Sequence, residues 1–163
     1  MCGGFNGVRV LSSVEIYDPE SDQWTMITPL LGPRSGHTVI SYKGNLLTIG
    51  GYDGRHRLRS AMQFDETEDC WMNFAPMLGC RSNFGAAVFE GQLYVIGGYN
   101  GETTISDVEK FEDSKNEWRK IQSLNMHRSA LGACAFSDVT NVTECSPKGP
   151  VIIRIVQLEQ PTP

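Results

Sequence analysis

The alternation of apolar and polar residues predicts short β-strands separated by turns. In the segment from residue 34 to residue 80, the strand-like runs occupy residues 38–42, 46–49, 60–64 and 70–74. The second run, Leu46–Ile49, has no polar alternation, which is typical of a strand buried on both faces. Lys43-Gly44-Asn45 has the residues of a tight turn with positive φ. The pattern therefore predicts an all-β fold with four strands in this segment.

The same pattern returns along the chain every 47 residues, as Trp24, Trp71 and Trp118 show. Other landmarks at this period are the glycine pairs at 3–4, 50–51 and 97–98, the aromatic residues at 17, 64 and 111, and the Arg-Ser pairs at 34–35, 81–82 and 128–129. A repeat of four short strands is typical of a propeller blade, which buries its faces on neighbouring blades. We expect the tryptophans to fill these contacts.

The repeat boundaries predict how the chain is divided. We expect a partial blade at residues 1–33, complete blades at 34–80 and 81–127, a single closing strand at 128–137, and an irregular tail at 138–163. The first piece begins inside a repeat and should supply three strands. Propellers typically have 4–8 blades, so we expect an open arc with exposed sheet edges.

The order of landmarks resembles the kelch repeat: an apolar strand, two glycines, an aromatic residue, a loop, and an aromatic residue before an acidic turn and a tryptophan. The three versions are Gly3-Gly4-Phe5-Asn6-Gly7, Gly50-Gly51-Tyr52-Asp53-Gly54 and Gly97-Gly98-Tyr99-Asn100-Gly101. The period also favours kelch, which runs nearer ~50 residues, over WD40 blades of ~40–45. The resemblance implies a partial kelch β-propeller with two complete four-stranded blades and two partial ones.

Residues 2 to about 144 look most like the last repeats of the BTB-kelch (kelch-like) family, in particular a testis member. In that family the kelch domain captures a protein substrate or its peptide degron, and a separate BTB domain binds a cullin so that the substrate is ubiquitinated. The resemblance implies such an adaptor role, in the cytoplasm and in spermatogenesis. We see no BTB or BACK region here, so cullin binding would need a BTB domain absent from this chain. An actin-binding cytoskeletal protein is the alternative, and a propeller enzyme is disfavoured.

By the same resemblance, the long loops and the connections between blades would hold the partner. The polar residues that contact the partner would be Arg34, Ser35, Arg81, Ser82, Arg128 and Ser129. The aromatic residues that contact it would be Phe5, Tyr52 and Tyr99. An alternative of equal weight is that each arginine hydrogen-bonds backbone carbonyls of the neighbouring blade. Loop residues that differ between blades are better candidates for specificity: Arg9, Arg55, His56, Arg57, Glu102, Thr103 and Thr104.

Composition argues against several other functions. The net charge is −5 and no basic run occurs, which disfavours nucleic-acid binding. The apolar stretches are only a few residues long, too short to span a bilayer, so no membrane contact is expected. The five cysteines lack the spacing of a zinc site. The three histidines are not set out for copper, and no nucleophile–base pair is visible, so we expect no cofactor, no metal and no catalysis.

Overall fold

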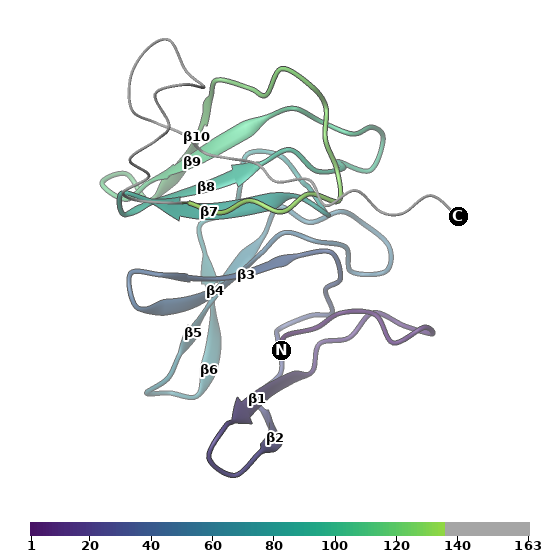
Figure 1. Cartoon of the computed structure of the whole chain (residues 1–163), viewed down its shortest axis with the longest axis vertical. Coiled ribbons are helices and arrows are strands. Elements are labelled where there is room, and N and C mark those ends of the chain that lie inside the picture. The colour runs from purple at the N-terminus through teal and green to yellow at the C-terminus, as the bar shows by residue number, and fades with distance from the viewer. Residues whose placement is uncertain (136–163) are drawn as a thin grey trace.

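The computed structural model describes residues 1–135, and Figure 1 shows that their regular elements are β-strands. The ten strands are β1 (Val14–Asp18), β2 (Gln23–Ile27), β3 (Thr38–Tyr42), β4 (Asn45–Ile49), β5 (Ala61–Asp65), β6 (Cys70–Phe74), β7 (Gly85–Phe89), β8 (Gln92–Ile96), β9 (Val108–Glu112) and β10 (Glu117–Ile121). The described part contains no helix, and therefore no helix able to cross a membrane. The predicted all-β class is confirmed.

The strands form three antiparallel sheets. Two of these sheets have four strands each, in the order β3-β4-β5-β6 and β7-β8-β9-β10 along the sheet, and the remaining sheet pairs β1 with β2. Each four-stranded sheet is thus a simple meander, which is the architecture expected of one blade. The two complete blades that the repeat predicted are present, with partial blade structure before them.

The partial pieces differ from the prediction. The first piece has two strands rather than three, and its expected third strand is reduced to an isolated bridge between Cys2 and Val14. Where a closing strand was expected at 128–137, Cys134 takes part in a β-bridge, and no longer strand is present up to residue 135. The rest of that strand and the predicted tail at 138–163 lie outside the described residues.

The hairpin turns decide which end of each blade carries long loops. Lys43 and Gly44 (φ 51° and 82°) join β3 to β4, and Glu90 and Gly91 (φ 48° and 71°) join β7 to β8. Positive φ at both central positions is the type I′ turn, whose twist matches that of the flanking strands. The longer β4–β5 and β8–β9 loops emerge at the opposite end of the blades (Figure 1). We call this the loop end.

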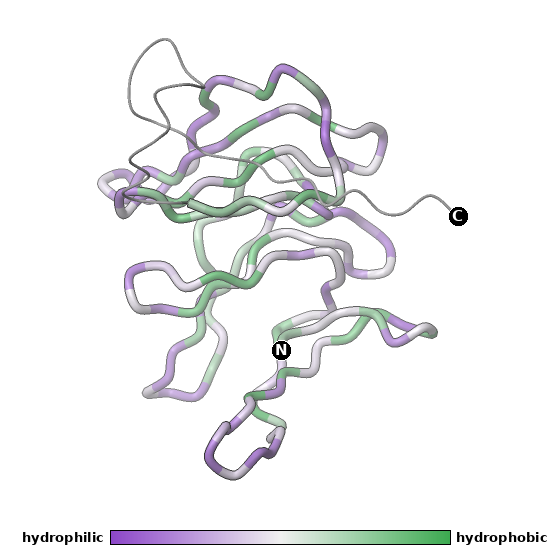
Figure 2. Tube along the Cα trace, in the orientation of Figure 1, coloured by the Kyte–Doolittle hydropathy of each residue, from purple (hydrophilic) through white to green (hydrophobic). Residues whose placement is uncertain are grey.

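Packing between blades forms the core. Trp71 and Trp118 are buried, and their Nε1 atoms donate to the carbonyls of Thr28 (3.1 Å) and Ala75 (2.9 Å), each in the connection that leaves the preceding blade. Figure 2 shows apolar residues concentrated on the strands and polar residues in the turns and loops. The tryptophans therefore fill blade contacts as predicted. The exception is Trp24 in the first blade, whose side chain is 53% exposed.

Candidate functional site

The repeated arginines lie inside the blades and hold the long loops closed. Arg34 is buried, and its Nη1 donates to the carbonyls of Gly50 and Ser60, both at 2.9 Å, while Nη2 donates to the Ser60 hydroxyl at 2.8 Å. Gly50 begins the β4–β5 loop and Ser60 ends it. The guanidinium therefore ties together the two ends of that loop. Burial lowers the pKa of Arg34 to about 10.

Arg81 repeats this arrangement in the next blade with an added ion pair. Its Nη1 donates to the carbonyls of Gly97 (2.9 Å) and Asp107 (3.0 Å), and its Nη2 contacts the carboxylate of Glu109. Arg81 is only 1% exposed. The same carboxylate accepts the backbone N–H of Leu78 at 2.7 Å. Buried charges need such partners, because desolvating an unpaired ion is costly.

The structure therefore corrects the proposed role of Arg34 and Arg81 as grips on a partner. The Nη1 atom of each donates to backbone carbonyls, as in the alternative interpretation, but these carbonyls belong to the same repeat rather than to the neighbouring blade. Their own main-chain carbonyls link the blades: Gly4 N–H donates to Arg34 at 2.7 Å, and Gly51 N–H donates to Arg81 at 2.8 Å. Both arginines are thus part of the scaffold.

Main-chain hydrogen bonds also engage Ser35, Ser82 and Arg128. Ser35 exchanges two main-chain hydrogen bonds of 2.9 Å with Tyr52, and Ser82 does the same with Tyr99. Ser82 is buried, which removes it from any surface, whereas Ser35, Arg128 and Ser129 are half-buried. The main chain of Arg128 is also engaged, since its carbonyl accepts the N–H of Gly98 at 2.7 Å. Ser35 and Ser82 therefore hold the segment that enters each repeat against the start of the long loop of the same repeat.

Each long loop carries the same side-chain-stabilised turn. Asn6, Asp53 and Asn100 occupy one repeat position, and the Oδ1 atom of each accepts the N–H groups two and three residues later. Asn and Asp favour such turns because the short side chain reaches the following backbone. The bonded N–H groups belong to Val8-Arg9, Arg55-His56 and Glu102-Thr103. Hydrogen bonds from the backbone of His56 and Arg55 hold the pKa of Asp53 below its usual value.

These turns present the residues that differ between blades. Val8 is 88% exposed at the tip of the first loop, and Arg55 and His56 are exposed at the tip of the second. We expected specificity to come from Arg9, Arg55 and His56, because the repeat varies at their positions. The structure places all of them in loops at the same end of the molecule. Exposed loop residues on a rigid scaffold are the usual carriers of binding.

Hydrogen bonds and cation–π contacts fix the positions of Tyr52 and Tyr99 in their loops. The hydroxyls of Tyr52 and Tyr99 donate to the carbonyls of Gly54 (2.8 Å) and Gly101 (2.9 Å), which folds each ring back over its own loop. The guanidinium carbon of Arg57 lies 4.0 Å from the centroid of the Tyr52 ring and 5.2 Å from that of Tyr99. Cation–π contacts at these distances link the second loop to the third.

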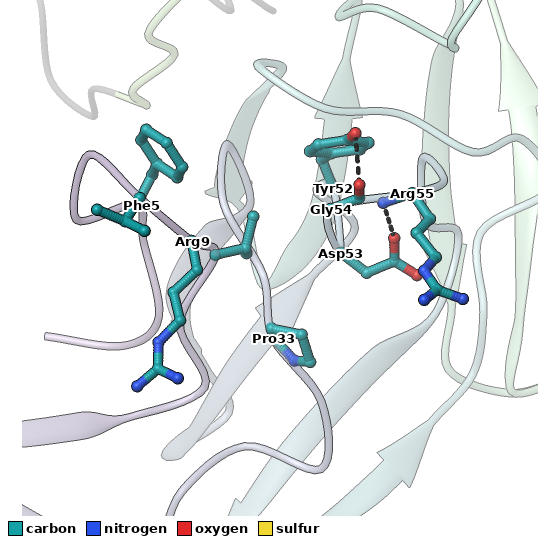
Figure 3. A pocket seen from close by; sticks show the side chains of 9 residues that line it. Phe5, Arg9, Pro33, Tyr52, Asp53, Gly54 and Arg55 are labelled. Carbon is teal, nitrogen blue, oxygen red and sulfur yellow. Dashed lines mark hydrogen bonds between the residues drawn. The ribbon is translucent and has the colours of Figure 1, made fainter.

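A hollow of about 530 Å³ lies between the first two loops. Figure 3 shows Arg9 and Arg55 on its two sides, with Pro33 between them. The side chains and backbone that line it are Phe5, Val8, Arg9, Val10, Pro33, Tyr52, Asp53, Gly54 and Arg55. Phe5 is 61% exposed, so a large aromatic face is available at this hollow, which Arg9 and Arg55 also line. Aromatic and arginine side chains are the residues that most often dominate protein-binding sites.

Residues 1–135 contain no cluster of side chains suited to hold a metal ion. No three His, Cys, Asp or Glu side chains gather as ligands within that range. His37 is packed between the first two blades, where burial, and then the charge of Arg34, lower its pKa to about 4. Val10 and Pro33 line the hollow but were missed in the sequence, because apolar residues carry no chemical signal there.

The comparisons with known proteins agree with this architecture. The sequence profile of the Kelch motif matches residues 2–31, 33–78 and 80–125. A "Kelch repeat and BTB domain-containing protein" of Caenorhabditis elegans is 38% identical over 48 residues. That alignment covers 29% of this chain and 8% of the worm protein, so the chain matches only a small part of its relative.

Proposed function

Because the chain belongs to the kelch-motif family, whose repeats serve as protein-interaction modules, we propose that its loop end captures a protein partner. The observation that carries this is the hollow between the first two loops. We define the loop surface as Phe5, Arg9, Tyr52, Arg55 and His56. It combines exposed aromatic area with cationic groups, and the scaffold beneath it is held by hydrogen bonds. A preorganised surface of this kind loses little entropy on binding.

The charge distribution indicates the chemistry of the partner. The chain as a whole has a net charge of −5, yet the hollow between the first two loops is lined by two guanidinium groups, Arg9 and Arg55, and by one carboxylate, Asp53. Much of the acidic charge lies at the opposite end, in the β1–β2 and β5–β6 turns, for example Asp18 and Glu68. Guanidinium groups bind carboxylates through paired charge-assisted hydrogen bonds. We therefore propose an acidic segment with an apolar side chain that packs on Phe5.

The finer proposal is that the chain is the substrate-recognition part of a BTB-kelch adaptor for a cullin-RING ubiquitin ligase. The partial match to a worm protein named for both kelch repeats and a BTB domain supports it, as does the resemblance of the loops to that family. The proposal assigns cullin binding to a BTB domain outside these 163 residues. It also places the adaptor in the cytoplasm.

A capture experiment with matched variants tests the proposal. The chain, Phe5→Ser/Arg55→Glu on the loop surface, and Lys110→Glu on β9, which changes the net charge by the same amount, would each be used as bait. We expect a defined set of acidic proteins to be lost with the loop variant and retained with the strand variant. A set of partners that is unchanged by the loop variant would contradict the loop surface. The adaptor role requires that a cullin joins the capture only when a BTB region is fused to the bait.

A further inference from the structure

The space between the second and third long loops is filled by a side chain of the molecule itself. The guanidinium carbon of Arg57 lies 4.0 Å from the centroid of the Tyr52 ring in its own loop and 5.2 Å from that of Tyr99 in the next loop. A Cβ added to Gly101 would lie 3.4 Å from Cγ of Arg57, so the stem of this side chain also runs close to the third loop. A planar group therefore occupies the space between two aromatic rings. We call this space the second gap.

The corresponding space between the first and second loops, which we call the first gap, is open. The 47-residue step relates Phe5 to Tyr52, Val10 to Arg57, and Tyr52 to Tyr99. The backbone relation is kept as well, because Val10 forms a β-bridge with Phe5 as Arg57 does with Tyr52. The side chain of valine ends at its methyl groups, whereas that of arginine continues to a planar guanidinium. The hollow of about 530 Å³ lies in the first gap, with Phe5 and Tyr52 on its opposite sides (Figure 3).

The exposure of Phe5 is a consequence of the open gap. The side chain of Phe5 is 61% exposed, whereas Tyr52 and Tyr99 at the same repeat position are half-buried. Each tyrosine hydroxyl also bonds a carbonyl of its own loop, and a phenylalanine has no hydroxyl with which to do so. A planar group that stacked on the Phe5 ring would remove apolar area from water and gain the favourable contact of paired rings.

The charges around the first gap decide which planar group fits it. Arg9, Arg55 and the carboxylate of Asp53 line the hollow. Oδ1 of Asp53 already accepts the backbone N–H groups of Arg55 and His56 at 2.6 Å and 2.7 Å. A second guanidinium, placed as Arg57 is in the second gap, would enter beside two like charges. An uncharged aromatic ring avoids this repulsion, and acidic residues next to it in a peptide can pair with the two guanidinium groups.

We propose that the first gap binds an aromatic side chain of an acidic partner segment, stacked between Phe5 and Tyr52 in the place that Arg57 takes in the second gap. The inference rests on the proposed function and adds the residues that make the two gaps differ. Val10 leaves the first gap open, and Arg57 closes the second, so this pair of residues directs the partner to one of two similar places. The hollow of about 530 Å³ is within the range of ~300–1,000 Å³ that ligand pockets span.

A pair of peptides tests the occupant of the first gap. The probe is a fluorescein-labelled pentapeptide with a central phenylalanine flanked by glutamates, and its control carries alanine at the centre. Fluorescence anisotropy with the full chain should give a Kd of about 0.1 mM or tighter for the phenylalanine peptide and binding at least about 10-fold weaker for the alanine peptide. Equal affinities for the two peptides, or no measurable binding of the phenylalanine peptide, would overturn the proposal.

Substitutions that fill the gap or remove one of its walls test the geometry. Val10→Arg copies Arg57 and should weaken binding of the phenylalanine peptide at least about 10-fold, although the added positive charge alone would strengthen attraction to an acidic peptide. Phe5→Ala removes an exposed wall and should weaken binding by a similar factor. Met126→Arg adds the same charge at an exposed position outside the hollow and should not weaken binding. Unchanged affinity in either Val10→Arg or Phe5→Ala would refute the stacking between Phe5 and Tyr52.

The capture experiment separates a failure of this inference from a failure of the proposed function. A set of partners that is lost with Phe5→Ser/Arg55→Glu and retained with Val10→Arg would keep the loop surface as the binding site and reject an aromatic side chain in the first gap. A set that is retained with both variants would contradict the loop surface itself. Loss with both variants is the result expected from the proposal.

Discussion

The packing of His37 between blades predicts that the free energy of unfolding decreases in acid. His37 lies at the repeat position of Phe84 and Leu131, which are buried apolar residues. Its imidazole is packed beneath the first blade: a Cβ on Gly3 would lie 2.9 Å from the ring, and one on Gly51 would lie 2.7 Å from the His37 Cβ. A charged imidazolium in this place would be poorly solvated and close to Arg34. These two causes, in that order, lower the pKa of His37 to about 4.

The sign and size of the effect follow from linkage. The pKa of His37 falls from 6.5 in the unfolded chain to about 4 in the folded one. Above pH 6.5 both states are neutral and the group contributes nothing. As the pH falls through this window, the unfolded chain binds a proton that the folded chain does not, so the free energy of unfolding decreases. The full loss below pH 4 is about 3 kcal/mol, of which about 2 kcal/mol is reached by pH 5.

The substitution His37→Phe isolates this term, because Phe84 shows that the position accepts a phenylalanine. Urea unfolding would be measured for both proteins at pH 7.5 and pH 5. Carboxylates whose pKa values are lowered, such as Glu112 and Asp113, weaken both proteins alike in acid. The wild type should therefore lose about 2 kcal/mol more than the variant over this range. Equal losses in the two proteins would refute the assignment of a buried neutral imidazole.

Three further substitutions probe the contacts between and within blades. Trp71→Ala should lower the free energy of unfolding by about 3–5 kcal/mol, whereas Trp24→Ala should cost less than about 0.5 kcal/mol. Equal costs in chemical denaturation would contradict the blade stacking. Glu109→Met copies Met62 of the preceding blade and should cost about 3 kcal/mol, because buried Arg81 loses its countercharge and backbone N–H groups lose an acceptor. A cost below about 1 kcal/mol would show that the ion pair is dispensable.

The strands were predictable because local chemistry and burial agree on them. The pattern placed β3 and β6 at the residues where they occur and placed β4 and β5 within one residue at each end. Lys43-Gly44 adopts the turn that fixes the β3–β4 register. The third strand of the first piece was not predictable in the same way. A strand needs a partner along its length, and among residues 1–135 the contacts of Met1 and Cys2 are with β1.

The site was predictable only in part, for a physical reason that differs between residue types. Arg34 and Arg81 have the residue type of a binding group, and the sequence cannot show that loop carbonyls already use their donors. Arg9, Arg55 and His56 were found because the repeat varies there. Hydrogen bonds from the turn backbone fix the loop tips that carry these three residues. Variation within the repeat therefore pointed to exposed loop positions, and their role in binding remains a prediction.

A repeated position reports the environment that every blade shares, and a varied position reports what a single blade adds. Glu109 and Met62 share one repeat position and are both buried, yet of the two only Glu109 gives an arginine a countercharge. Trp24 is the reverse case, because its residue type is repeated and its environment is not. The indole of Trp24 is 53% exposed and that of Trp71 is buried, and apolar area left in water costs about 25 cal/mol per Å². The period of the sequence therefore predicts the residue type at a blade contact, whereas the stability that the residue contributes depends on the surface that covers it.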